Sequence, residues 1–223
     1  MRTLFSRQTP SPRFVELTRL YKEMHRDGDR VNGIAAEQTF SGISLLPVAP
    51  QIKRLIDATG AATLLDYGCG KASQYGRSFV DPLQQSHADV VAYWGVKEVH
   101  RYDPAVPEYC AVPQGKFDGV ICTDVLEHCP EEDMAWIVDE LFAYANMFVF
   151  ANVACYPAHK LLPNGENAHC TIRPPAWWEN LFGDSAARHS GVDWEVWVAN
   201  IEEGSITADN RANVLIRRIG SDI

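Results

Sequence analysis

The sequence predicts one α/β domain over residues 1–223, built on a doubly wound, mostly parallel sheet with an antiparallel hairpin at its C-terminal edge. From Thr63 onward, short apolar runs alternate with helical segments, which is typical of a parallel sheet covered by helices on both faces. The last two runs follow each other without a helix between them, which predicts the hairpin. With 223 residues and 46% hydrophobic side chains, the chain suits one well-filled core better than two.

Before this alternation begins, residues 1–60 are expected to form an N-terminal helical cap on a core of residues 61–223. Apolar residues recur at helical spacing over 13–26, and the stretch rich in glycine and aspartate that follows breaks the pattern. A second helix is predicted over 50–59, and Gly60 ends it.

The core contains six candidate strands, which are the apolar runs 63–67, 98–103, 117–123, 147–154, 192–199 and 213–218. The clearest helix spans 130–145, where Pro130 and three acidic residues suit a helix N-terminus. Another helix is predicted to start at Pro174 and to carry Trp177 and Trp178.

The composition limits the classes of partner. The chain has 29 acidic and 20 basic residues, and its net charge of -9 speaks against a nucleic-acid partner. It contains no run of about 18 apolar residues and no apolar core of a secretory signal near its start. The six cysteines form no C-x-x-C pair, which argues against a zinc ribbon. We therefore expect a cytoplasmic protein that acts on a small molecule and neither enters a membrane nor binds nucleic acid.

The strongest motif is an apolar strand, 64–67, that runs directly into the glycine turn 68–70. Glycines let the backbone approach a ligand at the carboxyl edge of a strand, which is the natural binding crevice of an open α/β sheet. A phosphate-binding P-loop would need a glycine where the chain has Leu65, and a dinucleotide fingerprint would need one at Ser73. The turn therefore speaks against a P-loop and weakens the interpretation as a pyrophosphate site.

An acid two residues before a G-x-G turn resembles the first motif of class I, Rossmann-like methyltransferases that use S-adenosylmethionine. This resemblance implies the fold of that family and S-adenosylmethionine as cofactor. It implies that the turn surrounds the amino-acid end of the cofactor through Asp66, Tyr67, Gly68, Cys69 and Gly70. In the family a second acid, at the end of the next strand, binds the ribose hydroxyls, and Asp103, followed by Pro104, matches that position. A carboxylate accepts two hydroxyl hydrogen bonds at once, which is the physical reason for an acid there.

The spacing of these two acids departs from the family pattern. In a usual first βαβ unit the acid follows the glycines by about 20 residues, and here the separation is longer. An insertion around 81–97, with Tyr93 and Trp94, is implied. It either covers the cofactor, shapes the acceptor pocket or is an ordinary surface excursion. The insertion also makes Glu98 an alternative ribose acid.

A second motif, residues 117–128, resembles the fourth-strand motif of the same family, in which a phrase of the form D-V-L-E-H follows the strand and lines the methyl-transfer site. The resemblance implies that the cofactor also contacts the residues at the end of this strand, Thr123, Asp124 and Val125.

Glu127, His128 and His169 are the candidate catalytic residues. An imidazole titrates near neutral pH and can take a proton from an acceptor hydroxyl, so a lone histidine base is our preferred interpretation and no metal ligand is assigned. Carboxylates with imidazoles also bind divalent cations. The acid-x-x-Glu-His phrase that starts at Asp124, with the distant His169, is similar to the metal site of small-RNA 3′-terminal 2′-O-methyltransferases, which have Glu at the first position. A capping or core role for either histidine stays open.

The segment 155–178 follows the fifth strand of the family pattern and is expected to lie over the crevice, because long loops in compact domains are more often functional than not. His169, Arg173, Trp177 and Trp178 are its candidates for binding an anionic or planar acceptor. The alternative is that the two tryptophans anchor a helix on the sheet.

Together these patterns predict a methyltransferase that uses S-adenosylmethionine to modify an oxygen or nitrogen atom of a small-molecule acceptor. One alternative is a metal-assisted RNA 2′-O-methyltransferase, which the acidic balance disfavours. A second is a nicotinamide-dependent oxidoreductase, which the missing third glycine disfavours. A third is a cofactor-binding domain without catalytic activity.

Overall fold

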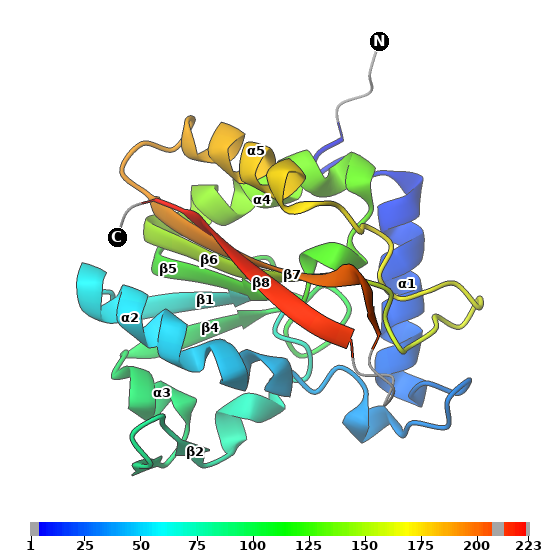
Figure 1. The fold of residues 1–223 in the computed structure, drawn as a ribbon, viewed down its shortest axis with the longest axis horizontal. Coiled ribbons are helices and arrows are strands. Elements are labelled where there is room, and N and C mark those ends of the chain that lie inside the picture. Colours follow the sequence, from blue (N-terminus) through cyan, green and yellow to red (C-terminus); the bar gives the residue numbers. More distant parts are fainter. Residues whose placement is uncertain (1–4, 207–211, 222–223) are drawn as a thin grey trace.

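A six-stranded sheet in the order β4-β1-β5-β6-β7-β8 forms the centre of the protein (Figure 1). The computed structural model describes residues 5–206 and 212–221, with the side chains of 5–199 and 218–221. The strands are β1 (Thr63–Tyr67), β4 (Glu98–Tyr102), β5 (Phe117–Thr123), β6 (Ala145–Cys155), β7 (Asp193–Ile206) and β8 (Ala212–Gly220). All run parallel except β8, which pairs antiparallel with β7. The predicted α/β sheet with an antiparallel edge hairpin is confirmed.

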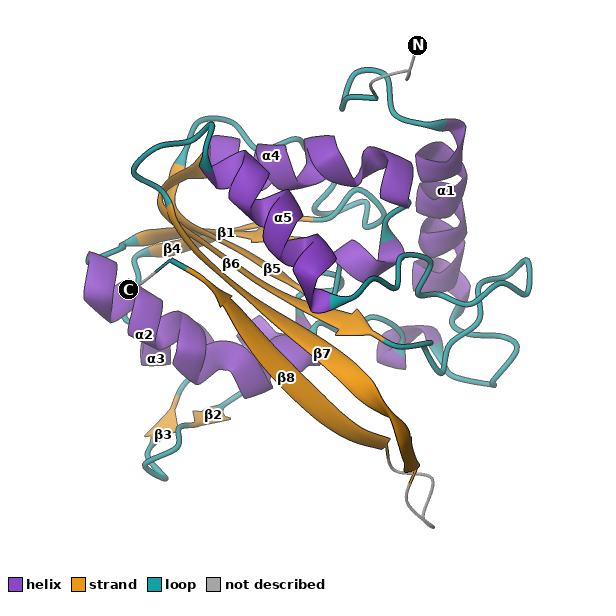
Figure 2. Cartoon of the chain, turned by 45° about the horizontal axis from the view of Figure 1, so that its top comes forward, coloured by secondary structure: helices purple, strands orange, loops and turns teal. Residues whose placement is uncertain are grey.

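Helices cover both faces of this sheet (Figure 2). The first face carries α2 (Ala49–Thr59) and α3 (Val90–Trp94), and the second carries α4 (Met134–Tyr144) and α5 (Pro175–Ala186). Leu64 packs in the core on the side of α2, and its neighbour Leu65 packs in the core on the side of α4 and α5. Because the central strands bury both faces, they read in the sequence as continuous apolar runs rather than as alternating ones.

The N-terminal helix α1 (Pro12–Asp27) stands beside the carboxyl ends of the strands (Figure 1). The hydroxyl of Ser11 caps it by accepting a hydrogen bond from the Phe14 amide at 3.0 Å. Its buried side packs against two residues of the long loop between β6 and α5, Leu162 and Ala168. The expected cap of 1–60 thus has two parts, because α1 lies beyond the sheet edge whereas α2 belongs to a helix layer.

Arg7 fastens the segment before α1 to the sheet. Its guanidinium forms a two-pronged ion pair with Glu140 of α4 and donates hydrogen bonds to the hydroxyls of Tyr102 at 2.6 Å and Tyr67 at 2.9 Å. The two tyrosines end β4 and β1, so one side chain joins the N-terminal segment, two strand ends and a helix.

The strand order reverses at β1, since β4 lies on one side of it and β5 on the other. In open α/β sheets such a reversal leaves a crevice at the carboxyl ends of the strands, where ligands bind. Within the described parts of the chain, no helix has both the length and the apolar character needed to cross a membrane.

Candidate active site

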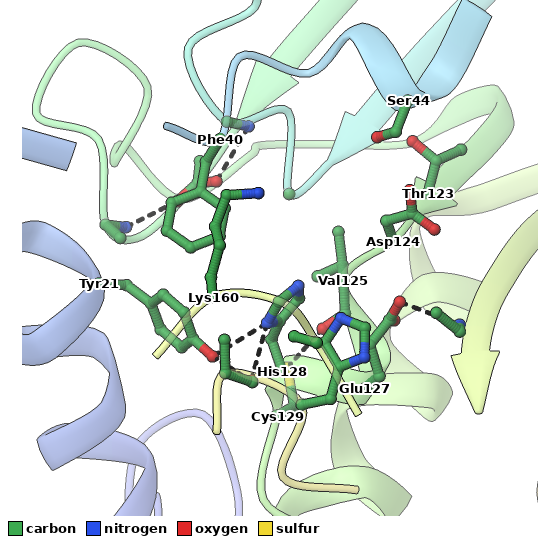
Figure 3. A pocket seen from close by; sticks show the side chains of 18 of the residues that line it. Tyr21, Phe40, Ser44, Thr123, Asp124, Val125, Glu127, His128, Cys129 and Lys160 are labelled. Atoms are coloured by element: carbon green, nitrogen blue, oxygen red, sulfur yellow. Dashed lines mark hydrogen bonds between the residues drawn. The ribbon is translucent and has the colours of Figure 1, made fainter. Parts of the chain in front are cut away.

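A cavity of about 460 Å³ lies at the reversal point. Its floor is formed by the turns that follow β1, β4 and β5, and its walls come from α1, from residues 38–44 and from the loop after β6. The glycine turn and the D-V-L-E-H phrase, which are far apart in the sequence, therefore face the same space. Figure 3 shows the end of the cavity that contains the D-V-L-E-H phrase.

The glycine turn presents bare backbone to this cavity. Gly68 and Gly70 both have positive φ angles, 87° and 56°. A Cβ atom on Gly68 would lie 2.4 Å from a methyl carbon of Val125, and one on Gly70 would lie 2.6 Å from the carbonyl oxygen of Phe40. Only glycine fits at either position, because both the backbone angle and the space exclude a side chain.

Asp103 lies beside the turn and holds it in place. One carboxylate oxygen accepts the Gly70 amide at 3.0 Å and the other accepts the Ala105 amide at 2.8 Å. Burial raises the pKa of Asp103, and these two amide hydrogen bonds oppose the rise. A carboxylate has about four acceptor positions, so each oxygen keeps one for a ligand hydroxyl.

Two residues that were expected to contact the cofactor lie behind the turn instead. Asp66 is 1% exposed, accepts hydrogen bonds from Tyr75 at 2.8 Å and Gln74 at 3.3 Å, and does not line the cavity. Burial raises its pKa to about 7. Cys69 is buried in the core with α2. The other eight residues expected at the cofactor line the cavity, namely Tyr67, Gly68, Gly70, Asp103, Pro104, Thr123, Asp124 and Val125.

Asp124 follows β5 in a backbone conformation that side chains rarely adopt, with a φ of 52°. Its carboxylate accepts a hydrogen bond from the Asn152 amide group at 2.6 Å, and its own amide donates to the Asn152 carbonyl at 3.1 Å. Burial raises the pKa of Asp124, and hydrogen bonds from Ser44 and Asn152 oppose this. Strained residues cluster at functional sites, so this position is a strong candidate for ligand contact.

Glu127 is fully buried at the base of the cavity. Its Oε1 accepts the Ala154 amide at 2.9 Å, and its Oε2 has no hydrogen-bond partner among the described residues. Burial, followed by the nearby charge of Asp124, raises the pKa of Glu127 well above its usual range. An unpaired buried carboxylate is costly. Glu127 is therefore protonated in the empty site or meets a cation or donor from a ligand.

The imidazoles of His128 and His169 lie near Glu127, and a backbone carbonyl beside each ring determines which ring nitrogen carries the proton. The Nδ1 atom of His128 lies 2.9 Å from the Ala168 carbonyl, and that of His169 lies 2.6 Å from the Tyr156 carbonyl. A carbonyl can only accept, so both Nδ1 atoms carry the proton and both Nε2 atoms present a lone pair. Burial lowers the pKa of His128 to about 3 and lowers that of His169 as well. Both rings are neutral at pH 7.

This trio has the donor set of a metal site. One ligand atom from each of Glu127, His128 and His169 lies within 4.8 Å of the others. In a tetrahedral site with bonds near 2.1 Å, ligand atoms lie about 3.4 Å apart, so these three atoms would have to move closer together to bind one ion. Neutral imidazoles and an unpartnered carboxylate oxygen fit a divalent cation, and the carbonyls behind the two imidazoles orient the rings as outer ligands do in metal sites.

The insertion around 81–97 lies outside the cavity. It contains part of a short hairpin, β2 (Phe79–Val80) with β3 (Ser86–His87), and then α3. None of its residues lines the cavity. Trp94 is buried and donates its indole N–H to the Ala49 carbonyl at 3.0 Å. The excursion is therefore packed beside α2, on the sheet face, and the interpretation as a cofactor cover is corrected.

Four other candidates also lie away from the cavity. Glu98 is exposed at the amino end of β4, the opposite end from the crevice. Arg173 pairs with Glu131 at the surface. Trp178 is fully buried and donates to the Arg173 carbonyl at 3.1 Å, and Trp177 packs edge-on against it. The tryptophans anchor α5 on the sheet, so the structure supports this alternative and not their binding of the acceptor.

Other cavity residues give no motif signal in the sequence. Tyr21 of α1 lies 3.0 Å from Nδ1 of His128 and donates to the Ala168 carbonyl at 2.7 Å. In the sequence it reads as one apolar position of an amphipathic helix. Phe40 lines the cavity with a φ of 51°, a backbone angle that no sequence pattern reveals.

No protein-family model, no curated protein and no solved structure matches this chain. The function therefore has to be inferred from the chemistry of the cavity.

Proposed function

We propose that the protein is a methyltransferase that uses S-adenosylmethionine and acts on an oxygen or nitrogen atom of a small-molecule acceptor. One observation carries this proposal, which is that two kinds of group line a single cavity. At one end lie the glycine turn and the carboxylate of Asp103, which has spare acceptor positions. At the other end lie the neutral imidazoles of His128 and His169. The first part suits an amino-acid group and a ribose, and the second suits an acceptor that must lose a proton.

In this proposal the residues act mainly by positioning. S-adenosylmethionine supplies, when bound, a methyl group on a positively charged sulfur. Asp103 holds the ribose hydroxyls, and the backbone of Gly68 and Gly70, which lines the cavity, contacts the amino-acid end. The acceptor atom forms its bond to the methyl carbon as the carbon–sulfur bond breaks, and the proton of the acceptor passes to an imidazole. Bringing two reactants together in line supplies much of the rate of such a reaction.

His169 is the better proton acceptor of the two histidines. The pKa of His128 falls to about 3 because the ring is buried, so that ring binds protons poorly. Burial also lowers the pKa of His169, but the charge of Asp124 acts in the opposite direction there. In this role the Tyr156 carbonyl keeps the Nδ1 proton in place, so Nε2 receives the proton from the acceptor.

The proposal is tested by calorimetric titration with S-adenosylmethionine and, separately, with NADH. We expect micromolar binding of S-adenosylmethionine, weakened by about tenfold or more in Asp103→Asn, since a hydrogen bond to a charged group contributes about 1.5–3 kcal/mol. Glu98→Gln, an exposed acid at the other end of β4, is the matched control and should bind as the wild type does. Absence of S-adenosylmethionine binding would refute the proposal, and binding of NADH in its place would favour an oxidoreductase.

The Glu127, His128 and His169 cluster supports a second candidate, metal-assisted methylation of a hydroxyl on a diol-bearing acceptor such as an RNA end. A divalent cation there would lower the pKa of the acceptor hydroxyl. The net charge of -9 speaks against an RNA acceptor. Titration with Mn²⁺ and Co²⁺ separates the two candidates: micromolar binding that is lost in Glu127→Gln and His169→Gln favours the metal-assisted route, whereas unchanged methyl transfer after chelation excludes it.

A further inference from the structure

Lys160 presents a positive charge to the cavity and forms no ion pair with a carboxylate of the described residues. Its side chain comes from the loop after β6 and lies alongside the Phe40 ring, with Nζ 5.4 Å from the ring centre (Figure 3). Among the residues that the structure describes, no carboxylate or other acceptor forms an ion pair or hydrogen bond with that Nζ.

The backbone holds Phe40 in a strained conformation beside this lysine. A φ of 51° is costly for a bulky side chain, and hydrogen bonds from Lys71 to the Phe40 carbonyl and from Ser73 to the Ser41 carbonyl, at 3.1 and 3.0 Å, maintain it. The ring packs against aromatic residues on three sides, which are Tyr21, His25 and His128. The strained backbone therefore holds the Phe40 ring at the cavity wall, between these aromatic residues and Lys160.

A polar atom without a partner lies at the same end of the cavity. The Nδ1 atom of His25 is buried and has no hydrogen-bond partner among the described residues, and His25 lines the cavity next to Phe40. Burial lowers the pKa of His25 to about 4, so its ring is neutral and can donate one hydrogen bond. The ammonium group of Lys160, the neutral imidazole of His25 and the aromatic ring of Phe40 therefore share one end of the cavity.

We infer that Lys160, with Phe40 and His25, forms a subsite that binds an anionic group, a carboxylate or a phosphate ester, of the methyl acceptor. The inference rests on the proposed function for calling this ligand a methyl acceptor. The cavity assigns the anion to the acceptor rather than to the cofactor carboxylate, because Lys160 is tied to the end of the cavity that holds the imidazoles. Its carbonyl accepts a hydrogen bond from the Ala168 amide at 3.1 Å, and the Ala168 carbonyl lies 2.9 Å from Nδ1 of His128.

Benzoate and phenyl phosphate are the anionic probes for this subsite, and benzamide is the neutral counterpart. Calorimetric titration without cofactor should show that wild-type protein binds an anionic probe more tightly than benzamide. In Lys160→Met we expect the affinity for that anionic probe to fall by about tenfold or more, the range of a charge-assisted hydrogen bond, with benzamide unchanged. Lys160→Arg should retain most of the affinity. Lys97→Met removes an exposed lysine outside the cavity and should behave as the wild type does.

Two results would overturn the inference. The first is that wild-type protein binds the anionic probes no more tightly than benzamide. The second is that Lys160→Met binds the anionic probes as tightly as the wild type does. The cofactor arm compares S-adenosylmethionine with 5′-methylthioadenosine, which lacks the carboxylate. If Lys160→Met weakens only the binding of S-adenosylmethionine, the lysine serves the cofactor and the acceptor assignment is wrong. If neither the wild type nor any variant binds S-adenosylmethionine, the proposed function fails. The titrations with the anionic probes still decide whether the anion subsite exists.

Discussion

At the scale of single residues, two buried carboxyl groups near the cavity have different roles. Among the described residues, Asp66 has hydrogen-bond donors on only one of its oxygens and lies beneath the glycine turn, whereas Glu127 lies at the base of the cavity with one partnerless oxygen. The first therefore supports the turn from behind, and the second is the candidate for contact with a ligand.

The raised pKa of Asp66 predicts a pH-dependent stability. Its pKa is about 7 in the folded protein, against 3.8 for an aspartate in an unfolded chain, so the folded state binds more protons between these values. The contribution of protonated Asp66 to the free energy of unfolding is fully present below pH 3.8 and is lost as the pH rises to about 7. Relative to wild type, we expect Asp66→Asn to gain stability on the order of 4 kcal/mol between pH 4 and pH 8.

Urea unfolding of wild type and Asp66→Asn across this pH range measures the difference directly. Because other titrating groups act in both proteins, their contributions cancel in the comparison. A stability difference that does not change with pH would contradict the assignment of a raised pKa to Asp66.

At the scale of secondary-structure elements, α1 is both a wall of the cavity and a support for His128. The Arg7 clamp precedes the helix, and Tyr21 within it contacts the Nδ1 atom of His128 at 3.0 Å. The position of the helix therefore depends on contacts made by the segment before it, and the site depends on the position of the helix.

Arg7→Met should loosen α1 and weaken ligand binding together. The substitution leaves Glu140 half-buried without its cation, and removing one partner of a buried pair costs about 3–5 kcal/mol, with the lower end expected for this partly exposed pair. Urea unfolding measures the loss, and limited proteolysis within 12–27 reports local loosening of α1. Arg19→Met removes an exposed arginine of the same helix and is the control. Unchanged proteolysis of α1 in Arg7→Met would show that the clamp does not position the helix.

At the scale of the whole molecule, the cavity depends on close contact between the turns after β1 and β5. Gly68 and Val125 come from different turns, yet a single added carbon on Gly68 would lie 2.4 Å from Val125. The space for a ligand is therefore a property of how neighbouring strands pack, and not of either turn alone.

Gly68→Ala should destabilise the fold by about 1–3 kcal/mol because of its positive φ and should distort the cavity wall. Adding Val125→Ala removes the clashing methyl groups, so the double variant should recover the part of the loss that is due to the clash. Double-mutant cycles of urea unfolding measure this coupling. Gly76→Ala, where an added carbon meets nothing within 4 Å and φ is not positive, is the control. Additive losses would mean that backbone strain alone accounts for the effect.

The sequence by itself determined the fold class and the turns that line the cavity. Strands 63–67 and 117–123 match β1 and β5, because strands buried on both faces need apolar runs that end at polar turns. Parallel strands place their carboxyl ends on one edge, so the residues after β1, β4 and β5 were expected to meet, and they line one cavity.

Only the tertiary structure decided which side chains face that cavity. Asp66 and Cys69 belong to the motif but lie behind the turn, while Tyr21 and Phe40, from segments outside both motifs, line the cavity. The physical reason is that the direction and the burial of a side chain depend on contacts between segments distant in the chain. The positive φ of Phe40, for example, is maintained by hydrogen-bond partners more than 30 positions away. Local patterns report local preferences and contain no record of these contacts.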